Sequence, residues 1–119
     1  MPQTDIVQRT FNFGVAVIDL CRAIEKQSDV SRTLARQLLR SGTSVGANVE
    51  EAQAAQSTAD FINKMNIALK EARETHYWLR LLTVSRIIAG EQNQAVCQEA
   101  DEIKRIIATI IVNTKRSAK

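Results

Sequence analysis

Apolar side chains recur every three or four residues along most of the chain, which is the spacing typical of amphipathic helices. This pattern predicts helices over residues 5–27, from Ser31 through Ala52, from Ser57 to just before Gly90, and over residues 93–114. Ser31 and Ser57 are expected to cap the second and third helices, with Asp60 completing a weak capping box, and Gly90 is expected to end the third. No stretch alternates apolar and polar residues for long enough to form a strand, so the fold is predicted to be all-α.

Each predicted helix has one apolar stripe that faces a shared core. In chain order the stripes are Ile6, Phe13, Val17, Leu20 and Ile24; Leu34, Leu38, Val45, Val49 and Ala52; Phe61, Met65, Ala68, Ala72 and Leu79; and Val96, Ala100, Ile103, Ile107 and Ile110. The chain has 119 residues and one proline, Pro2, so it fits a single domain, residues 1–119, of long helices. Short connections between four such helices favour an antiparallel up-down-up-down bundle.

The first helix carries a second apolar stripe on its opposite side. Val7, Phe11, Val15 and Ile18 form this stripe, and Trp78 likewise lies off the core stripe of its own helix. Covering the second stripe within one subunit would need long flanking segments, which a chain of this length scarcely supplies. The pattern therefore favours a homo-oligomer with these five residues at the subunit interface over a helix that is buried on both sides within one subunit.

The basic residues indicate a candidate surface for nucleic acid. The formal net charge is +3, and the candidate phosphate contacts are a row on one helix and a C-terminal group: Arg32, Arg36, Arg40, Lys115, Arg116 and Lys119. Ordinary solvated surface is the alternative, but repetition of the row around an oligomer would add up its positive field. Tyr77 and Trp78 are the only residues expected to stack on bases, so binding should depend on RNA or DNA backbone charge rather than base sequence.

The sequence gives little support for an enzyme or a cofactor. Its one histidine, His76, has Arg73 three residues before it, so the Glu-x-x-His pairs of a di-iron bundle cannot form, and no metal site is expected. Cys21 and Cys97 are interpreted as reduced thiols that pack as small apolar groups. The longest apolar run is too short to span a membrane, so a soluble, cytoplasmic protein without membrane contact is expected.

The stretch "RSGTSVGANVEEA", residues 40–52, lacks the strand and the lysine of a phosphate-binding loop. As a helix it presents Gly42 and Gly46 on one face, where another backbone can approach closely. Its polar side chains are predicted to pair with the third helix in a structural network of Arg40, Ser44, Asn48, Glu51, Glu71 and Glu74. In an antiparallel hairpin Arg40 should be level with Glu74, Ser44 with Lys70 close to Glu71, and Asn48 with Asn66, and Asn48 should bond across helices or to a neighbouring backbone.

This stretch, together with "FINKMNIALKEARETHYWLRLL", resembles a known family, the four-helix bundle proteins first met in open reading frames of 23S ribosomal RNA intervening sequences. The likeness covers nearly the whole chain and is most specific at Ser44, Asn48 and Glu51. Many members have glycine after that glutamate, where this chain has Ala52. The resemblance implies a left-handed up-down-up-down bundle that forms a homopentamer with a channel on the five-fold axis. Relatives include the accessory variability determinant proteins of diversity-generating retroelements, which bind a reverse transcriptase and nucleic acid.

These expectations combine into a non-catalytic homo-oligomeric scaffold. It would bind the nucleic-acid backbone, or a partner that processes nucleic acid, without base specificity and without a cofactor. A purely structural or protein-binding oligomer is the main alternative, and a nuclease is a third class. The salt dependence of binding to unrelated RNA and DNA sequences discriminates among the three.

Overall fold

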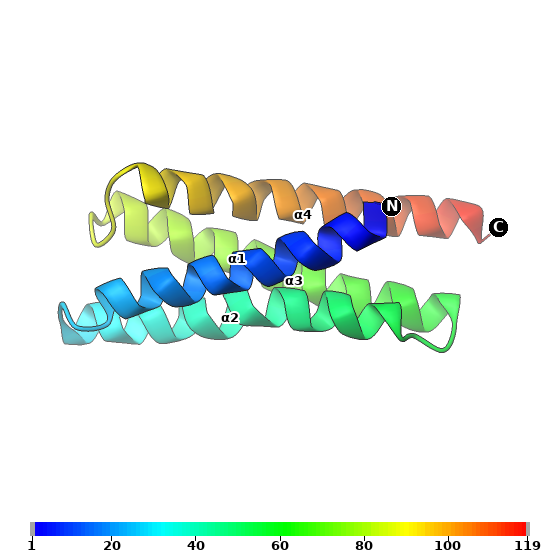
Figure 1. The fold of residues 1–119 in the computed structure, drawn as a ribbon, viewed down its shortest axis with the longest axis horizontal. Coiled ribbons are helices and arrows are strands. Elements are labelled where there is room, and N and C mark those ends of the chain that lie inside the picture. The colour runs from blue at the N-terminus through cyan, green and yellow to red at the C-terminus, as the bar shows by residue number, and fades with distance from the viewer. Residues whose placement is uncertain (1, 119) are drawn as a thin grey trace.

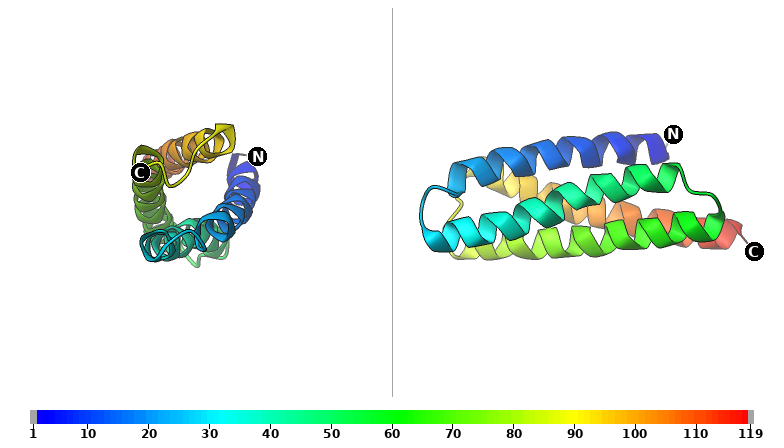
Figure 2. Two further views of the ribbon diagram at one scale, coloured as in Figure 1. Left: turned by 90° about the vertical axis from the view of Figure 1, so that its left-hand side faces the viewer. Right: turned by 90° about the horizontal axis from the view of Figure 1, so that it is seen from below.

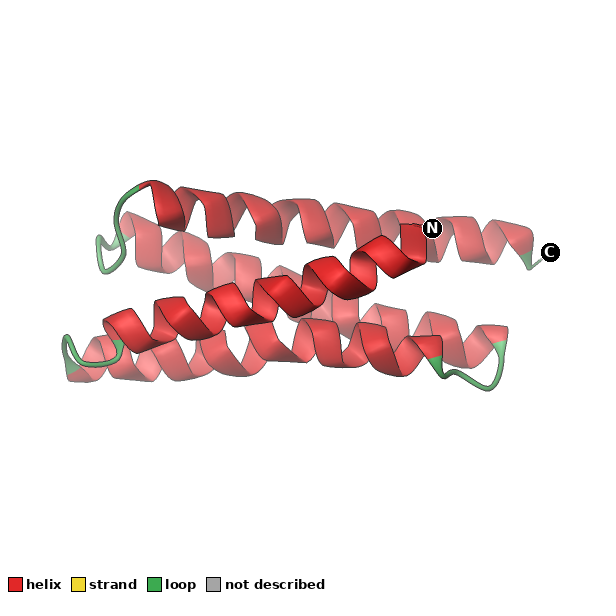
Figure 3. Cartoon of the chain, in the orientation of Figure 1, coloured by secondary structure: helices red, strands yellow, loops and turns green. Residues whose placement is uncertain are grey.

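The computed structural model describes residues 2–118, with the side chains of residues 2–5 and 92 left out. Four helices make up nearly all of it: α1 (Pro2–Ile24), α2 (Asp29–Gln53), α3 (Thr58–Val84) and α4 (Glu91–Ser117) (Figure 1). Residues 2–118 contain no strand, and three short connections separate the helices (Figure 3). The prediction of an all-α fold is confirmed.

The helices are arranged around a square, so that each contacts two others. Close backbone contacts join α1 with α2, α2 with α3, α3 with α4, and α4 with α1, whereas the backbones of α1 and α3 lie on a diagonal and do not come close within residues 2–118. The end-on view in Figure 2 shows this arrangement, and Figure 1 shows successive helices running in opposite directions. The molecule measures 50 × 22 × 19 Å, so surfaces at its two ends are far apart.

The core lies where the four apolar stripes meet. Eighteen of the twenty stripe residues are buried, and Leu34 and Phe61 pack half-buried at the edge of the core. Ile88, in the connection between α3 and α4, closes one end of the core at 4% exposure. The structure also separates the two stripes of α1, because the face containing Phe13 and Val17 is the buried one.

The helix caps correct two expectations. Ser28, not Ser31, is the N-cap of α2, because its Oγ accepts the Ser31 backbone N–H at 3.0 Å, and Ser31 is itself buried. Ser57 caps α3 as predicted and accepts the Asp60 N–H at 3.1 Å. The Asp60 carboxylate accepts the Gln56 N–H at 3.2 Å rather than that of Ser57, so the reciprocal bond of a capping box is absent there.

Gly90 does not end α3, which is a third correction. The helix stops at Val84, and the chain turns at Arg86, whose φ of 64° is in the left-handed region. Gly90, with φ of 98°, is the N-cap residue of α4 and makes no side-chain capping bond. A glycine fits this position because a side chain disfavours such a φ.

The two glycines of α2 permit close contact with α1 rather than with α3. A Cβ on Gly46 would lie 3.1 Å from the backbone oxygen of Thr10, and one on Gly42 would lie 2.8 Å from a methyl group of Val17. Both distances are shorter than ordinary van der Waals contact between carbon and its neighbours. The small residues therefore set the distance between α1 and α2, while Arg40 and Ser41 of the same stretch contact α3.

Candidate functional site

A charged contact joins α2 and α3 midway along the bundle. The guanidinium of Arg40 pairs with the carboxylates of Glu71, at 3.3 Å, and Glu74. The Glu74 carboxylate also accepts the indole N–H of Trp78 at 3.2 Å. The hydrogen bond and the charge of Glu74 are the main cause that raises the pKa of Arg40, and Glu71 adds a smaller effect, so the residue stays charged. The prediction that Arg40 and Glu74 lie at the same height along the hairpin is confirmed, and their contact aligns the two helices.

A buried pair of hydroxyls lies beside this contact, and the sequence did not single it out. The Oγ atoms of Ser41 and Thr75 are 2.9 Å apart, both residues have 0% exposure, and the Thr75 hydroxyl donates to the Glu71 carbonyl at 2.7 Å. The sequence does place Ser41 at a core position, because it lies on the buried side of its helix between Leu38 and Val45. Polar residues at core positions need partners, and these two supply each other.

The rest of the predicted polar network is more local than expected. Ser44 Oγ donates to the Arg40 carbonyl at 2.7 Å, and Asn48 Nδ2 donates to the Ser44 carbonyl at 2.8 Å. Asn48 thus bonds to a neighbouring backbone, one of its two predicted outcomes, and within the described residues neither it nor Ser44 has a bond to α3. Short side chains on a helix reach the carbonyl one turn back more easily than a neighbouring helix. Glu51 is exposed and lies outside the network.

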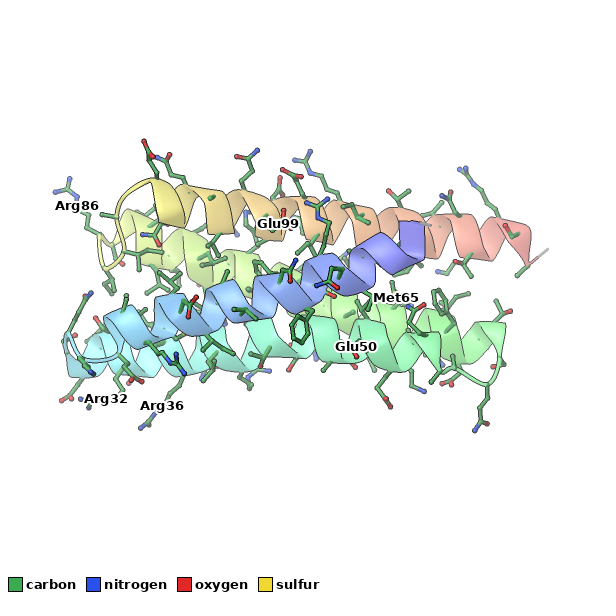
Figure 4. All side chains as sticks on the ribbon, in the orientation of Figure 1. Arg32, Arg36, Glu50, Met65, Arg86 and Glu99 are labelled. Atoms are coloured by element: carbon green, nitrogen blue, oxygen red, sulfur yellow. The ribbon has the colours of Figure 1, made fainter. Side chains whose placement is uncertain are left out.

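The second stripe of α1 is open to solvent in the single chain. Phe11 is 57% and Val15 46% exposed, whereas Ile18 is half-buried and Val7 packs against the edge of the core. Phe11, Val15 and Ile18 border a groove of about 520 Å³ between α1 and α2. Its α2 wall consists of Thr43, Gly46, Ala47, Glu50 and Glu51. The groove is apolar along α1 and acidic along one rim, where Figure 4 labels Glu50.

Trp78 does not join this groove. It belongs to α3, on the diagonal from α1, and is half-buried beside Glu74 with its ring edge-on to Tyr77 at 5.2 Å. The structure therefore places four of the five predicted interface residues on α1 and the fifth on a separate surface.

The predicted phosphate contacts are divided and partly neutralised. Arg32 pairs with Asp29 at 2.8 Å and Arg40 with two glutamates, while Arg36 is exposed and has no ion pair among the described residues. Arg32 and Arg36 lie near the α1–α2 connection in Figure 4, at the opposite end from the C-terminus. Lys115 and Arg116 are exposed near that C-terminus, and Lys119 lies outside the described residues.

His76 is half-buried between α3 and α4. Its Nδ1 lies 3.4 Å from Lys104 Nζ. Burial lowers its pKa, and the positive charges of Lys104, Arg80 and Arg105 lower it further against the opposing effect of Asp101. Beside it is an open groove of about 360 Å³ that Cys97 and Asp101 help to line.

Both thiols are free. Cys21 is buried, its Sγ donates to the Ala35 carbonyl at 3.3 Å, and burial raises its pKa to about 11. Burial also raises the pKa of Cys97. Across the described residues, no three histidine, cysteine, aspartate or glutamate side chains gather in a way that could hold a metal ion. No described helix combines the length and apolar character needed to cross a membrane.

The four packed helices, the polar contacts between α2 and α3, and the open apolar groove beside α1 define a small helical-bundle protein. The family described as 23S rRNA-intervening sequence protein matches residues 2–109, and the chain belongs to this family. The resemblance noted from the sequence is confirmed.

One solved structure gives a close comparison. It is the crystal structure of a protein with unknown function from the S23 ribosomal protein family of Bacteroides thetaiotaomicron VPI-5482, similar at a TM-score of 0.85 and 42% identity. The match covers 93% of this chain and 98% of that chain, so the whole bundle is shared. No curated protein has significant similarity to the chain.

Proposed function

We propose that this protein is a non-catalytic, cytoplasmic homo-oligomeric scaffold that binds the backbone of RNA or DNA, or a partner that processes nucleic acid. The exposed apolar stripe of α1 is the observation that carries the proposal. Phe11 and Val15 are both about half exposed, next to an apolar groove. Contiguous apolar surface of this kind on a small soluble protein marks an interaction site.

The assembly we propose is the homopentamer implied by the family resemblance, built from left-handed up-down-up-down bundles. A second copy of the chain is the occupant proposed for the α1 groove. Such an assembly needs no cofactor, and it would multiply the net charge of +3 by the number of subunits.

Nucleic acid is the proposed ligand because phosphate backbones respond to summed positive charge. The names of the family and of the Bacteroides structure refer to 23S rRNA and to an S23 ribosomal protein, which agrees with a partner of this kind. A reverse transcriptase is a candidate protein partner on the same resemblance.

A second candidate function is a purely structural or protein-binding oligomer. The pairing of Arg32 with Asp29, and of Arg40 with two glutamates, favours it, because these carboxylates cancel much of the charge that was expected to attract phosphate.

Two measurements on the purified chain test the proposal. Sedimentation at micromolar concentration should give one multimer, and a monomer would contradict the assembly. Binding to unrelated RNA and DNA sequences should weaken steeply with salt and vary little with sequence. Absence of binding would favour the second candidate function, and cleavage would identify a nuclease and contradict a non-catalytic role.

A further inference from the structure

The strongest unassigned cluster lies along the contact between α3 and α4. Lys104 Nζ is 3.4 Å from His76 Nδ1, and Asp101 bridges Lys104 and Arg105 at 3.2 and 3.0 Å. Arg80 adds a fourth basic residue, since its charge acts on both His76 and Cys97. We call His76, Arg80, Lys104 and Arg105 the seam cluster.

The seam cluster keeps more unbalanced positive charge than the α2 row. In the row, Arg32 pairs with Asp29 and Arg40 with Glu71 and Glu74, so three carboxylates accompany three arginines although Arg36 itself is unpaired among the described residues. In the seam cluster, Lys104 and Arg105 share the single carboxylate of Asp101, and Arg80 has no ion pair among the described residues. A phosphate is attracted by the local excess of charge, which is greater at the seam.

The cluster is also accessible and bordered by polar groups. The Arg105 side chain is 76% and that of Lys104 29% exposed, and Arg80 is exposed as well. The adjacent groove of about 360 Å³ is lined by His76, Thr83, Gln94, Cys97, Gln98 and Asp101, most of which can donate or accept hydrogen bonds. A phosphate lying over the seam would therefore find both charge and hydrogen-bond donors.

An exposed aromatic ring extends the surface. The Arg80 guanidinium lies 5.9 Å from the centre of the Tyr77 ring, and Tyr77 is 48% exposed. Arginine and tyrosine side by side suit a single strand of nucleic acid, because the arginine contacts phosphate while a base stacks on the ring.

We infer that the seam between α3 and α4 is the nucleic-acid contact of this protein, with Arg80, Lys104 and Arg105 binding backbone phosphates of a single strand and Tyr77 stacking against its bases. This inference rests on the proposed function and replaces the α2 row as the site of contact. Arg105 and Arg80 provide the first contact, and Lys104 turns from Asp101 and His76 towards the phosphate.

His76 gives the site its own signal. In the free protein it faces Lys104, Arg105 and Asp101 from α4 and Arg80 from its own helix, so added positive charge at its ring is disfavoured. A bound phosphate brings negative charge to the same place and favours protonation of the ring. The pKa of His76 therefore rises when the site is filled, whereas binding at the α2 row leaves it unchanged.

Two matched variants locate the site. Arg80→Gln with Arg105→Gln removes two charges at the seam, and Arg32→Gln with Arg36→Gln removes two from α2. Binding of an unstructured single-stranded RNA and of a DNA of the same sequence is measured at several salt concentrations. The seam variant should lose roughly tenfold or more in affinity, and its salt slope on single strands should fall by about 1.4. The α2 variant should change affinity less than about threefold. Tyr77→Leu should weaken binding without changing the slope.

The outcomes separate this inference from the proposed function. If wild type binds and the two charge variants lose affinity equally, or the α2 variant loses more, the seam is not the site although the scaffold still binds nucleic acid. If wild type binds neither strand, the seam assignment fails together with the nucleic-acid binding of the proposed function, while sedimentation still tests the assembly. The His76 ring, followed by NMR over a pH series, should show a higher pKa with RNA. The same rise with inorganic phosphate alone, in a protein that binds no strand, would identify a free-ion site and overturn the assignment to nucleic acid. Circular dichroism melts check that each variant is folded.

Discussion

At the residue scale, the pKa of His76 depends on its burial and on the charges around it. Its ring is half-buried beside Lys104, and its pKa is lowered from the ordinary value of 6.5, first by burial and then by nearby cations. Because the folded chain holds this proton less tightly than the unfolded chain, protonation of His76 favours unfolding.

The free energy of unfolding should therefore decrease as the pH falls from above 6.5 through the lowered pKa of His76. Urea titrations at pH 7.5 and pH 5.5 measure this difference. His76→Gln keeps a polar side chain and cannot titrate, so its difference between the two pH values should be smaller than that of wild type. An equal difference in both proteins would assign the acid effect to other groups.

The buried hydroxyls make a second prediction at this scale. Thr75→Val keeps the shape of the side chain but leaves the Ser41 hydroxyl with a lost partner at 0% exposure. The change should lower the free energy of unfolding by about 1 to 3 kcal/mol in chemical denaturation. Thr83→Val is the matched control, because Thr83 is exposed and bonds only within its own helix, to the Leu79 carbonyl at 2.8 Å. Similar effects of the two changes would mean that the buried pair does not stabilise the fold.

At the scale of elements, the close contact of α1 with α2 depends on Gly42 and Gly46. In an ordinary helix interior, glycine to alanine stabilises by about 1 kcal/mol. Here the sign should reverse, because the added methyl would meet Val17 or the backbone of α1 at Thr10.

Gly46→Ala should therefore lower the midpoint of thermal unfolding. Gly14→Ala provides the comparison, since nothing in the single subunit lies within 4 Å of its added methyl and stabilisation of the subunit is expected. A stabilising effect at Gly46 equal to that at Gly14 would show that α1 can move away at little cost.

Helix periodicity predicted the helices well but did not predict where they begin and end. The stripe that includes Leu38, Val45 and Val49 follows the helix repeat and is buried as predicted, because burial depends on a pattern that many residues share. A cap depends on one bond. Ser28 and Ser31 are both serines before an apolar segment, and only the backbone geometry identifies Ser28 as the cap.

Only part of the candidate site could be predicted from the sequence. Equal distance from the hairpin turn brought Arg40 to Glu74, since long charged side chains tolerate small errors in register. The same rule did not place Ser44 or Asn48, whose short side chains bond within α2. The seam cluster combines side chains from α3 and α4 whose relative rotation no single-helix pattern specifies.

At the scale of the whole molecule, the exposed second stripe of α1 leads to a prediction about assembly. Phe11→Asp with Ile18→Asp places two charges in the groove, so assembly should be lost and sedimentation should give monomers or aggregates. Val84→Asp is the control, because Val84 is 83% exposed on α3, away from the groove, and its change should leave the multimer intact. A multimer that survives the double change would place the interface elsewhere.

Both chain termini lie at the same end of the bundle, and α1 and α4, which carry them, are in contact (Figures 1 and 2). The chain is therefore suited to circular permutation, which changes the order of the helices in the sequence and keeps their packing. A flexible linker from the C-terminus to the N-terminus, with new ends cut between Gln27 and Ser28, would make α2 the first helix and α1 the last. The new termini then lie at the opposite end of the bundle, at the α1–α2 connection, so a tag attached to them leaves the original terminal end uncovered.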